Sequence, residues 1–246
     1  MRDTWVGTSW KMHKTLAQAR TYAVQLAEID HQQWDAVQVF VLPPATALHT
    51  VVEALGPSSP VMVGAQNAHW CDEGPWTGEV SVPQVADAGA SMVEIGHAER
   101  RAHFGETDHT VNLKVHAALR HGIRPLVCVG EPASAKGVQG SVDYVCRQAR
   151  AALEGIGADA EVLLAYEPVW AIGDGAQAAR PEDVAPVCRA LSDELSGADV
   201  LYGGSVGLEN AADLICVDGV DGLFIGRAAW DVGDFVAIIE AVAANR

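Results

Sequence analysis

The sequence predicts an α/β fold, a single-domain (β/α)8 barrel of eight parallel strands with outer helices. Two observations lead to this prediction: short apolar runs recur eight times along the chain, and each is followed by a longer segment with helical periodicity. Eight such units in 246 residues come to roughly 30 residues each, the size of one strand, loop and crossover helix. A chain of this length forms such a barrel as one domain, here residues 1–246.

The expected strands are short runs rich in β-branched and other apolar residues. They lie at Trp5–Gly7, Val37–Leu42, Val61–Ala65, Met92–Ile95, Leu126–Val129, Val162–Ala165, Val200–Tyr202 and Leu223–Ile225. An open doubly wound sheet is the alternative arrangement for these units. The even number of strands and the absence of a G-x-G-x-x-G motif after the first run favour the closed barrel.

The expected helices carry an apolar stripe on one side, which is typical of helices that pack against a sheet. In the first of them, Ala19, Ala23 and Leu26 share a face. The segments with this pattern are Leu16–Ile29, Val111–Arg120, Val142–Leu153, Pro181–Leu195 and Phe235–Val242. No charge run or long Gly/Ser linker divides the chain, so a single domain is expected.

The charge balance excludes several classes of partner. The chain has 32 acidic and 16 basic residues, a formal net charge of −16, which makes nucleic acid and anionic membranes unsuitable partners. The same charge repels a small anion at long range. Any phosphate must therefore be held by local donors, such as a nearby cation, backbone N–H groups or a helix N-terminus.

The five cysteines are odd in number, far apart and free of any C-x-x-C pair, which argues against a disulfide framework and a zinc site. They fit a reducing compartment. No apolar segment follows the N-terminus, and no run approaches the ~20 apolar residues of a membrane span. We therefore expect a cytoplasmic protein.

Three polar residues lie within about four residues of the end of an expected strand, where a barrel carries its catalytic groups. Lys11 follows the first strand, although a solvated surface lysine would look the same. His97 follows Gly96 after the fourth strand; such a residue can bind a metal, but no second ligand is spaced to suit one. Glu167 leaves the sixth strand into a loop with Pro168 and Trp170, where desolvation would raise its pKa and its basicity.

Glycine-bearing turns follow the last two strands, at Tyr202–Ser205 and Ile225–Arg227. Glycine lets backbone N–H groups approach an oxyanion closely, and the loops after strands seven and eight of a barrel often bind phosphate. These turns therefore predict a phosphate site.

Seven segments, in order along the whole chain, resemble motifs of triosephosphate isomerases. They are Trp10-Lys11-Met12, Gly64-Ala65-Gln66-Asn67, Thr77-Gly78-Glu79, Gly96-His97, Glu99-Arg100-Arg101, Tyr166–Gly173 and Tyr202–Val206. On these motifs the sequence is identified as a member of that family. The resemblance implies an intramolecular oxidoreductase of the aldose–ketose isomerase type, which acts in carbohydrate metabolism on a small phosphorylated sugar without a cofactor or a metal.

The resemblance also implies roles for individual residues. Glu167 would move a proton between neighbouring carbons of the substrate, while a neutral His97 polarises the carbonyl and shuttles protons between its oxygens. Lys11 would offset the charge of the enediolate and the phosphate, and Glu99 resembles the family's glutamate that contacts this lysine.

Backbone donors and a lid are implied in the same way. The groups expected to donate to the phosphate are Gly173, Gly204, Ser205 and Gly226. The segment Trp170–Ala176 resembles the mobile lid that keeps water away from the enediol.

The segment Gln66–Glu79 resembles the loop through which family members form homodimers, with Thr77 reaching the partner's site. A free surface loop is the alternative, but Trp70 and Trp76 would be costly to leave exposed. A homodimer is therefore expected.

The sequence departs from the usual family pattern near the site. Ser9 stands in place of an asparagine, Ala98 in place of a serine and Arg227 in place of a glycine. Asp174 and Ala176 replace a threonine and a lysine of the lid. Such changes arise by drift in an ordinary triosephosphate isomerase, or they mark a changed substrate, since Ser9 makes room and Arg227 adds a cation at the phosphate end.

Three segments resemble the subgroup of the family that acts as L-erythrulose-1-phosphate isomerase in erythritol catabolism. They are Gly7–Met12, Ala68–Trp70 and Phe224–Trp230. Two substrate pairs stay open: dihydroxyacetone phosphate with D-glyceraldehyde 3-phosphate, as in glycolysis, and L-erythrulose 1-phosphate with D-erythrulose 4-phosphate. A third alternative is a catalytically weak barrel that binds a phosphosugar.

Overall fold

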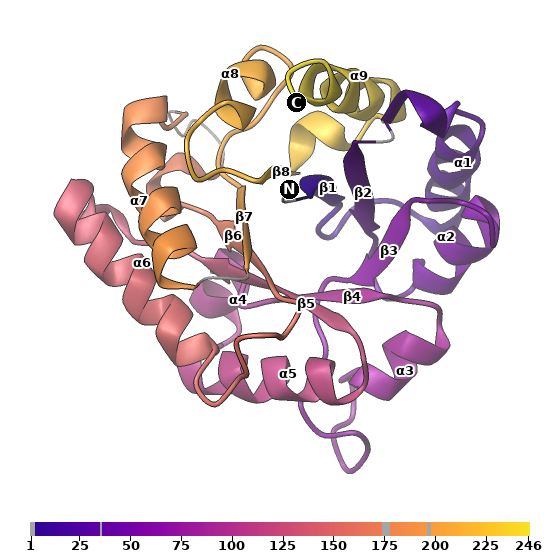
Figure 1. Cartoon of the computed structure of the whole chain (residues 1–246). Helices are drawn as coiled ribbons and strands as arrows, with labels where there is room; N and C mark the ends of the chain where they lie inside the picture. The colour runs from indigo at the N-terminus through magenta and orange to yellow at the C-terminus, as the bar shows by residue number, and fades with distance from the viewer. Residues whose placement is uncertain (1–2, 35, 174–177, 196–197) are drawn as a thin grey trace.

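Eight parallel strands close into a barrel at the centre of the molecule (Figure 1). The computed structural model describes residues 3–34, 36–173, 178–195 and 198–246. The strands are β1 (Thr4–Ser9), β2 (Val37–Leu42), β3 (Met62–Ala65), β4 (Met92–Ile95), β5 (Arg124–Val129), β6 (Leu163–Tyr166), β7 (Asp199–Tyr202) and β8 (Gly222–Ile225). Strands β1 and β8 pair with each other, so the closed barrel is confirmed and the open doubly wound sheet is wrong.

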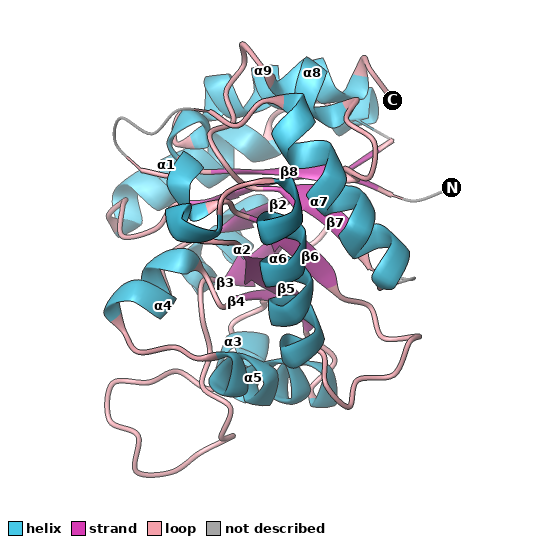
Figure 2. Cartoon of the chain, turned by 90° about the vertical axis from the view of Figure 1, so that its left-hand side faces the viewer, coloured by secondary structure: helices cyan, strands magenta, loops and turns pink. Residues whose placement is uncertain are grey.

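Helices form the outer layer around this barrel, as both views show (Figures 1 and 2). The α-helices of the described chain are α1 (Leu16–Ala27), α2 (Leu48–Leu55), α3 (Val82–Asp87), α4 (Ala98–His103), α5 (Asp108–Arg120), α6 (Val138–Ala152), α7 (Pro181–Glu194), α8 (Ala211–Ile215) and α9 (Val232–Ala243). Short 3-10 turns lie at η1 (His31–Trp34), η2 (Ala133–Ala135), η3 (Val169–Ala171) and η4 (Arg227–Ala229).

The strands separate two apolar layers because successive side chains point to opposite faces. On β2, Phe40 and Leu42 belong to the cluster inside the barrel, whereas Val39 and Val41 pack in the layer beneath the helices. The inner cluster also takes Met92 from β4. The inside of the barrel is thus a packed core, and the open space for chemistry lies at its end.

The strand and helix boundaries differ from the predicted ones where polar residues extend an element. Strand β1 runs on to Ser9, because Thr8 and Ser9 continue the pairing with β2. Helix α5 begins at Asp108 rather than at Val111, since Thr107 and Thr110 form a capping box before its apolar stripe starts.

Four short helices have no counterpart in the sequence-based prediction: α2, α3, α4 and α8. Each has between 5 and 8 residues, about two turns or fewer, and an apolar period is hard to recognise over that length. Helix α4 has no buried residue at all.

The connection between β3 and α3 projects from the barrel as a loop (Figures 1 and 2). Within it His69 is buried; its ring stacks on Trp70 at 4.0 Å between centroids and lies 4.3 Å from the tilted ring of Trp76. Trp76 nevertheless stays 44% exposed. Across the described residues, no helix combines the length and apolar character needed to cross a membrane.

Candidate active site

The ten residues predicted for the site all border one cavity of about 530 Å³. These residues are Ser9, Lys11, His97, Glu99, Glu167, Gly173, Gly204, Ser205, Gly226 and Arg227. They come from the carboxyl ends of β1, β4, β6, β7 and β8 and from the segments that follow those strands. The fold therefore gathers residues that are far apart in the sequence at one mouth of the barrel.

Lys11 has a backbone conformation that is uncommon for a residue with a side chain. Its φ is +51°, in the left-handed region, and the side-chain amide of Gln66 donates to its carbonyl at 3.0 Å. Lys11 Nζ donates to Glu99 Oε1 at 2.6 Å. Burial raises the pKa of Glu99, but the hydrogen bond from Lys11 and the nearby His97 lower it by a larger amount. The pKa of Glu99 therefore lies below its ordinary value. Such strain is typical of a functional position.

Glu167 directly follows β6 and is buried. Its backbone N–H donates to the carbonyl of Val129 at 2.8 Å, which fixes the residue against β5. A Cβ added to Gly203 would lie 2.9 Å from Glu167 Cγ, so the neighbouring strand end leaves room for this side chain only because residue 203 is glycine. Glu167 Oε2 is buried without a hydrogen-bond partner among the described residues. Buried acceptors without a partner are uncommon in folded proteins, so this oxygen marks Glu167 as unusual.

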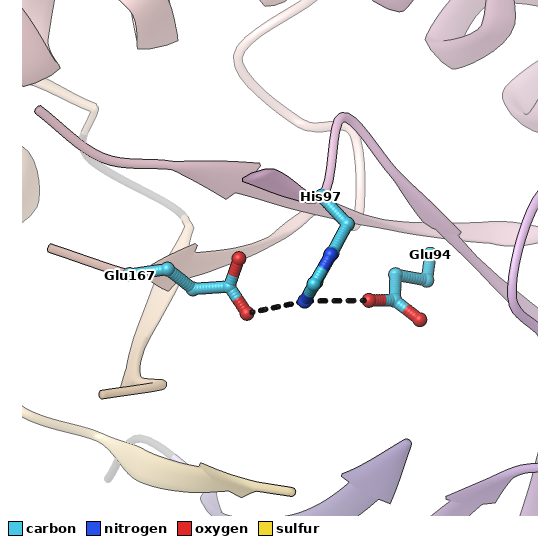
Figure 3. Close-up of side chains that lie close together, drawn as sticks. All are labelled: Glu94, His97 and Glu167. Carbon is cyan, nitrogen blue, oxygen red and sulfur yellow. Dashed lines mark ion pairs between the residues drawn. The ribbon is translucent and has the colours of Figure 1, made fainter. Parts of the chain in front are cut away.

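The side chains of Glu94, His97 and Glu167 point toward one another, and His97 lies between the two carboxylates (Figure 3). Its Nε2 is 3.5 Å from Glu167 Oε1 and 3.9 Å from Glu94 Oε1. On the other side of the ring, Nδ1 accepts a hydrogen bond from the backbone N–H of Glu99 at 3.1 Å, at the start of α4. A nitrogen that accepts from an N–H carries no proton, so this geometry is that of a neutral ring with its proton on Nε2.

Electrostatics act on the same ring in the opposite direction. Burial lowers the pKa of His97, but the carboxylates of Glu167 and Glu94 outweigh burial, and its pKa lies above the ordinary value. The two observations favour different protonation states. We assign the neutral ring, because protonated Nδ1 would place two N–H groups against each other. A proton on Glu94 would also remove one of the charges that raise the pKa.

Glu94 is the residue of this site that the sequence analysis missed. It lies within β4, it is 2% exposed, and Ser9 Oγ donates to its Oε2 at 3.0 Å. Burial raises the pKa of Glu94 to about 7, despite the opposing effect of His97. The available signal was a charged residue in an otherwise apolar strand, in step with Met92, which points into the barrel.

We predict that Glu94→Gln makes the stability of the protein less dependent on pH. The folded-state pKa of Glu94 is raised, so its stabilising contribution is fully present below the unfolded pKa and is lost as the pH rises through about 7. Between about pH 5 and about pH 8, the free energy of unfolding of the wild type should fall by on the order of 3 kcal/mol relative to that of the variant. Urea unfolding of both proteins at these two pH values checks this. Parallel pH profiles would contradict it.

The end of the cavity at which the sequence predicts phosphate binding is formed by backbone turns. Gly173 has φ +100°, which favours glycine, and a Cβ added to either Gly173 or Gly226 would meet no described atom within 4 Å. The hydroxyl of Ser205 donates to the carbonyl of Ala171 at 2.8 Å, which links this turn to the loop after β6. Arg227 is exposed and borders the same cavity.

The first part of the expected lid is held by a buried carboxylate. Trp170 Nε1 donates to Glu131 Oε1 at 2.7 Å, and Tyr166 and Ser141 donate to the same oxygen. Asp174 and Ala176, two of the departures from the family pattern, lie outside the described residues. A third departure, Ala98, borders a smaller cavity of about 230 Å³ and not the one that holds the predicted site.

Glu94, His97 and Glu167 each offer one ligand atom, and these atoms lie within 4.8 Å of one another. One imidazole nitrogen and two carboxylate oxygens are donors that divalent cations accept. These three side chains are therefore the group in the described chain that could hold a metal ion. The expectation that none is needed stays a prediction.

Comparison with known proteins agrees with the geometry of the site. The sequence model described as Triosephosphate isomerase matches residues 4–242. An L-erythrulose-1-phosphate isomerase of Mycolicibacterium smegmatis is 52% identical over 246 residues, which cover 98% of this chain and 94% of that protein. Proteins of the same name from Rhizobium meliloti and Brucella abortus are 49% and 45% identical, with 97% of this chain and 96% of each relative covered.

These matches extend over nearly the whole chain and over nearly the whole of each relative. The chain is accordingly an enzyme, a phosphosugar isomerase of the aldose–ketose type. The barrel, the site and these relatives together show that the chain belongs to the triosephosphate isomerase family.

Proposed function

We propose that this enzyme interconverts L-erythrulose 1-phosphate and D-erythrulose 4-phosphate. The observation that carries the proposal is the 45–52% identity to proteins named L-erythrulose-1-phosphate isomerase. The interconversion of dihydroxyacetone phosphate and D-glyceraldehyde 3-phosphate is the second candidate, because the family model itself carries the triose name.

The proposed reaction moves a proton between two neighbouring carbons. In L-erythrulose 1-phosphate the carbonyl is at C2, and Glu167 takes the proton from C3 while electrons shift to the carbonyl oxygen. The proton on His97 Nε2 passes to that oxygen and gives the enediol. The ring then takes the proton of the C3 hydroxyl, and Glu167 returns its proton to C2, which leaves the carbonyl at C3. Atoms and electrons balance without an external oxidant.

Lys11 and the turns after β7 and β8 supply the charge that this chemistry needs. Glu99 holds Lys11 at 2.6 Å, so the ammonium group is fixed where negative charge develops on the oxygens. Backbone groups of Gly173, Gly204, Ser205 and Gly226, together with Arg227, border the region proposed for the phosphate. The segment from Trp170 onward is proposed as the lid over this region.

We also propose that the enzyme works as a cytoplasmic homodimer. Trp76, in the projecting loop Gln66–Glu79, has 44% of its surface exposed, and Met12 and Phe104, which border a cavity next to the site, are exposed as well. Large apolar side chains left exposed favour a protein–protein contact. Sedimentation at several concentrations tests the dimer; a monomer throughout would contradict it.

Turnover of both substrates by the same purified protein tests the proposed function. We expect kcat/KM for L-erythrulose 1-phosphate to exceed that for D-glyceraldehyde 3-phosphate. If the triose is turned over orders of magnitude faster, the tetrulose assignment is wrong. Failure with both substrates, despite tight binding of a phosphosugar, would favour a binding protein instead.

A double variant tests whether the two departures from the family pattern set the preference. Ser9→Asn combined with Arg227→Gly should shift the ratio of kcat/KM toward the triose. The first change would fill space beside the reacting carbons with a larger amide, and the second would remove a cation from the phosphate end. Each single variant serves as a control for the other. An unchanged ratio would assign both departures to drift.

A further inference from the structure

The catalytic cavity has a neighbour of about 450 Å³. Four residues border both cavities: Ser9, Lys11, His97 and Glu99. The phosphate-side residues Ser205 and Gly226 border only the first cavity, whereas Glu94 borders only the second. Glu94 therefore lies on the side of His97 that is remote from the phosphate turns.

A linear sugar phosphate in this site has a defined direction. With its phosphate at the turns after β7 and β8, its reacting carbons lie between Glu167 and His97. Its far end then reaches the boundary between the two cavities, where Ser9 and Glu94 meet. L-erythrulose 1-phosphate differs from dihydroxyacetone phosphate by one hydroxymethyl group, and that group is attached at this far end.

We propose that Glu94, held by Ser9, forms the subsite for the terminal hydroxymethyl group of a four-carbon sugar phosphate and sets the preference for the tetrulose over the triose. This inference rests on the proposed function and assigns the part of the protein that recognises the fourth carbon.

The contacts of Glu94 leave one oxygen able to take a ligand. Ser9 donates to Oε2 at 3.0 Å. Around Oε1, the donors from the described part of the chain are the Cys128 thiol at 4.0 Å and His97 Nε2 at 3.9 Å, both long contacts. A substrate hydroxyl at Oε1 would make a shorter hydrogen bond than either.

The energetics of Glu94 support the same role. A carboxyl buried with so few donors destabilises the free protein, as its raised pKa indicates. A site that binds a hydroxyl through a buried polar group also discriminates against an analogue that lacks the hydroxyl, since the group is then left without its partner. The presence of Glu94 at this place is explained by recognition rather than by stability.

The test compares Glu94→Leu and Glu94→Gln with wild type on two substrates. For L-erythrulose 1-phosphate we expect kcat/KM to fall by roughly 10- to 100-fold in Glu94→Leu, the worth of one hydrogen bond to a charged group. For dihydroxyacetone phosphate we expect a smaller fall, because the triose has no group at this subsite; any loss that acts through His97, 3.9 Å from Glu94, is common to both substrates. Glu94→Gln keeps the shape of the side chain, so its kcat/KM for L-erythrulose 1-phosphate should lie between those of wild type and Glu94→Leu.

Cys128→Ala is the matched control. Its thiol contacts the same oxygen of Glu94 but borders neither the catalytic cavity nor its neighbour. Any effect of this variant through packing should be the same for both substrates. A loss specific to the tetrulose in Cys128→Ala would contradict recognition by the carboxyl itself.

Equal losses on both substrates in the Glu94 variants would overturn the proposal and assign Glu94 to the setting of His97. Calorimetry with two unreactive ligands separates the subsite from the proposed function. Wild type should bind erythritol 4-phosphate more tightly than glycerol 3-phosphate, and Glu94→Leu should lose this preference, whether or not the tetrulose is turned over. No preference in wild type overturns the subsite.

Discussion

Glu167→Gln is expected to reduce kcat by roughly 10²- to 10⁴-fold, because a glutamine amide cannot take a proton from carbon. The side chains have nearly the same shape, and the backbone hydrogen bond to Val129 at 2.8 Å is unaffected. The free energy of unfolding should therefore change little. Steady-state kinetics with the better of the two substrates, together with urea unfolding, measure both quantities.

Glu167→Asp is the matched control for this prediction. It keeps the base but withdraws the carboxylate by one methylene, so its kcat should lie between those of wild type and Glu167→Gln. Deuterium uptake from D₂O gives an independent readout: wild type should place deuterium on the substrate carbon, and Glu167→Gln should not. Substantial turnover by Glu167→Gln would move the role of the base to another group, with Glu94 the nearest candidate carboxyl.

The sequence was sufficient to predict which residues gather around one cavity, because the topology does most of the positioning. In a closed parallel barrel the carboxyl ends of all strands lie at the same mouth. Residues that follow strands, such as Lys11, His97 and Glu167, are therefore expected near one another once the strands are identified. The glycine turns at Gly204 and Gly226 follow the same rule. Strand boundaries needed only approximate accuracy for this purpose, and an error of two residues at β1 moved Ser9 into the strand but not out of the site.

What the sequence did not predict depends on side-chain detail. Glu94 lies inside a strand, so a search of strand ends passes over it, and only its burial beside His97 reveals its importance. The protonation of His97 follows from one hydrogen bond, donated by the amide of Glu99. Ala98 was expected beside the chemistry, but the start of α4 directs it to a different cavity.

Lys114→Met is expected to have the largest effect on stability. Lys114 and Glu106 form a buried ion pair at 2.7 Å, and Lys114 also donates to Asn67 Oδ1 at 2.7 Å. Methionine fills similar space but leaves the Glu106 carboxylate paired only with Arg100 among the described residues. Breaking a buried pair from one side typically costs about 3–5 kcal/mol, and we expect a loss of that order in urea unfolding.

Two controls distinguish loss of the pair from loss of packing. Lys114→Met with Glu106→Gln should recover part of the stability, because the buried carboxylate that lost its lysine partner is then no longer charged. Arg189→Met, which breaks the exposed pair with Asp218, should leave stability nearly unchanged. Since Asn67 is the second residue of the projecting loop, Lys114→Met should also weaken any dimer that forms through Gln66–Glu79. A double variant no more stable than Lys114→Met would show that the lysine stabilises the fold through its packed stem, not through its charge.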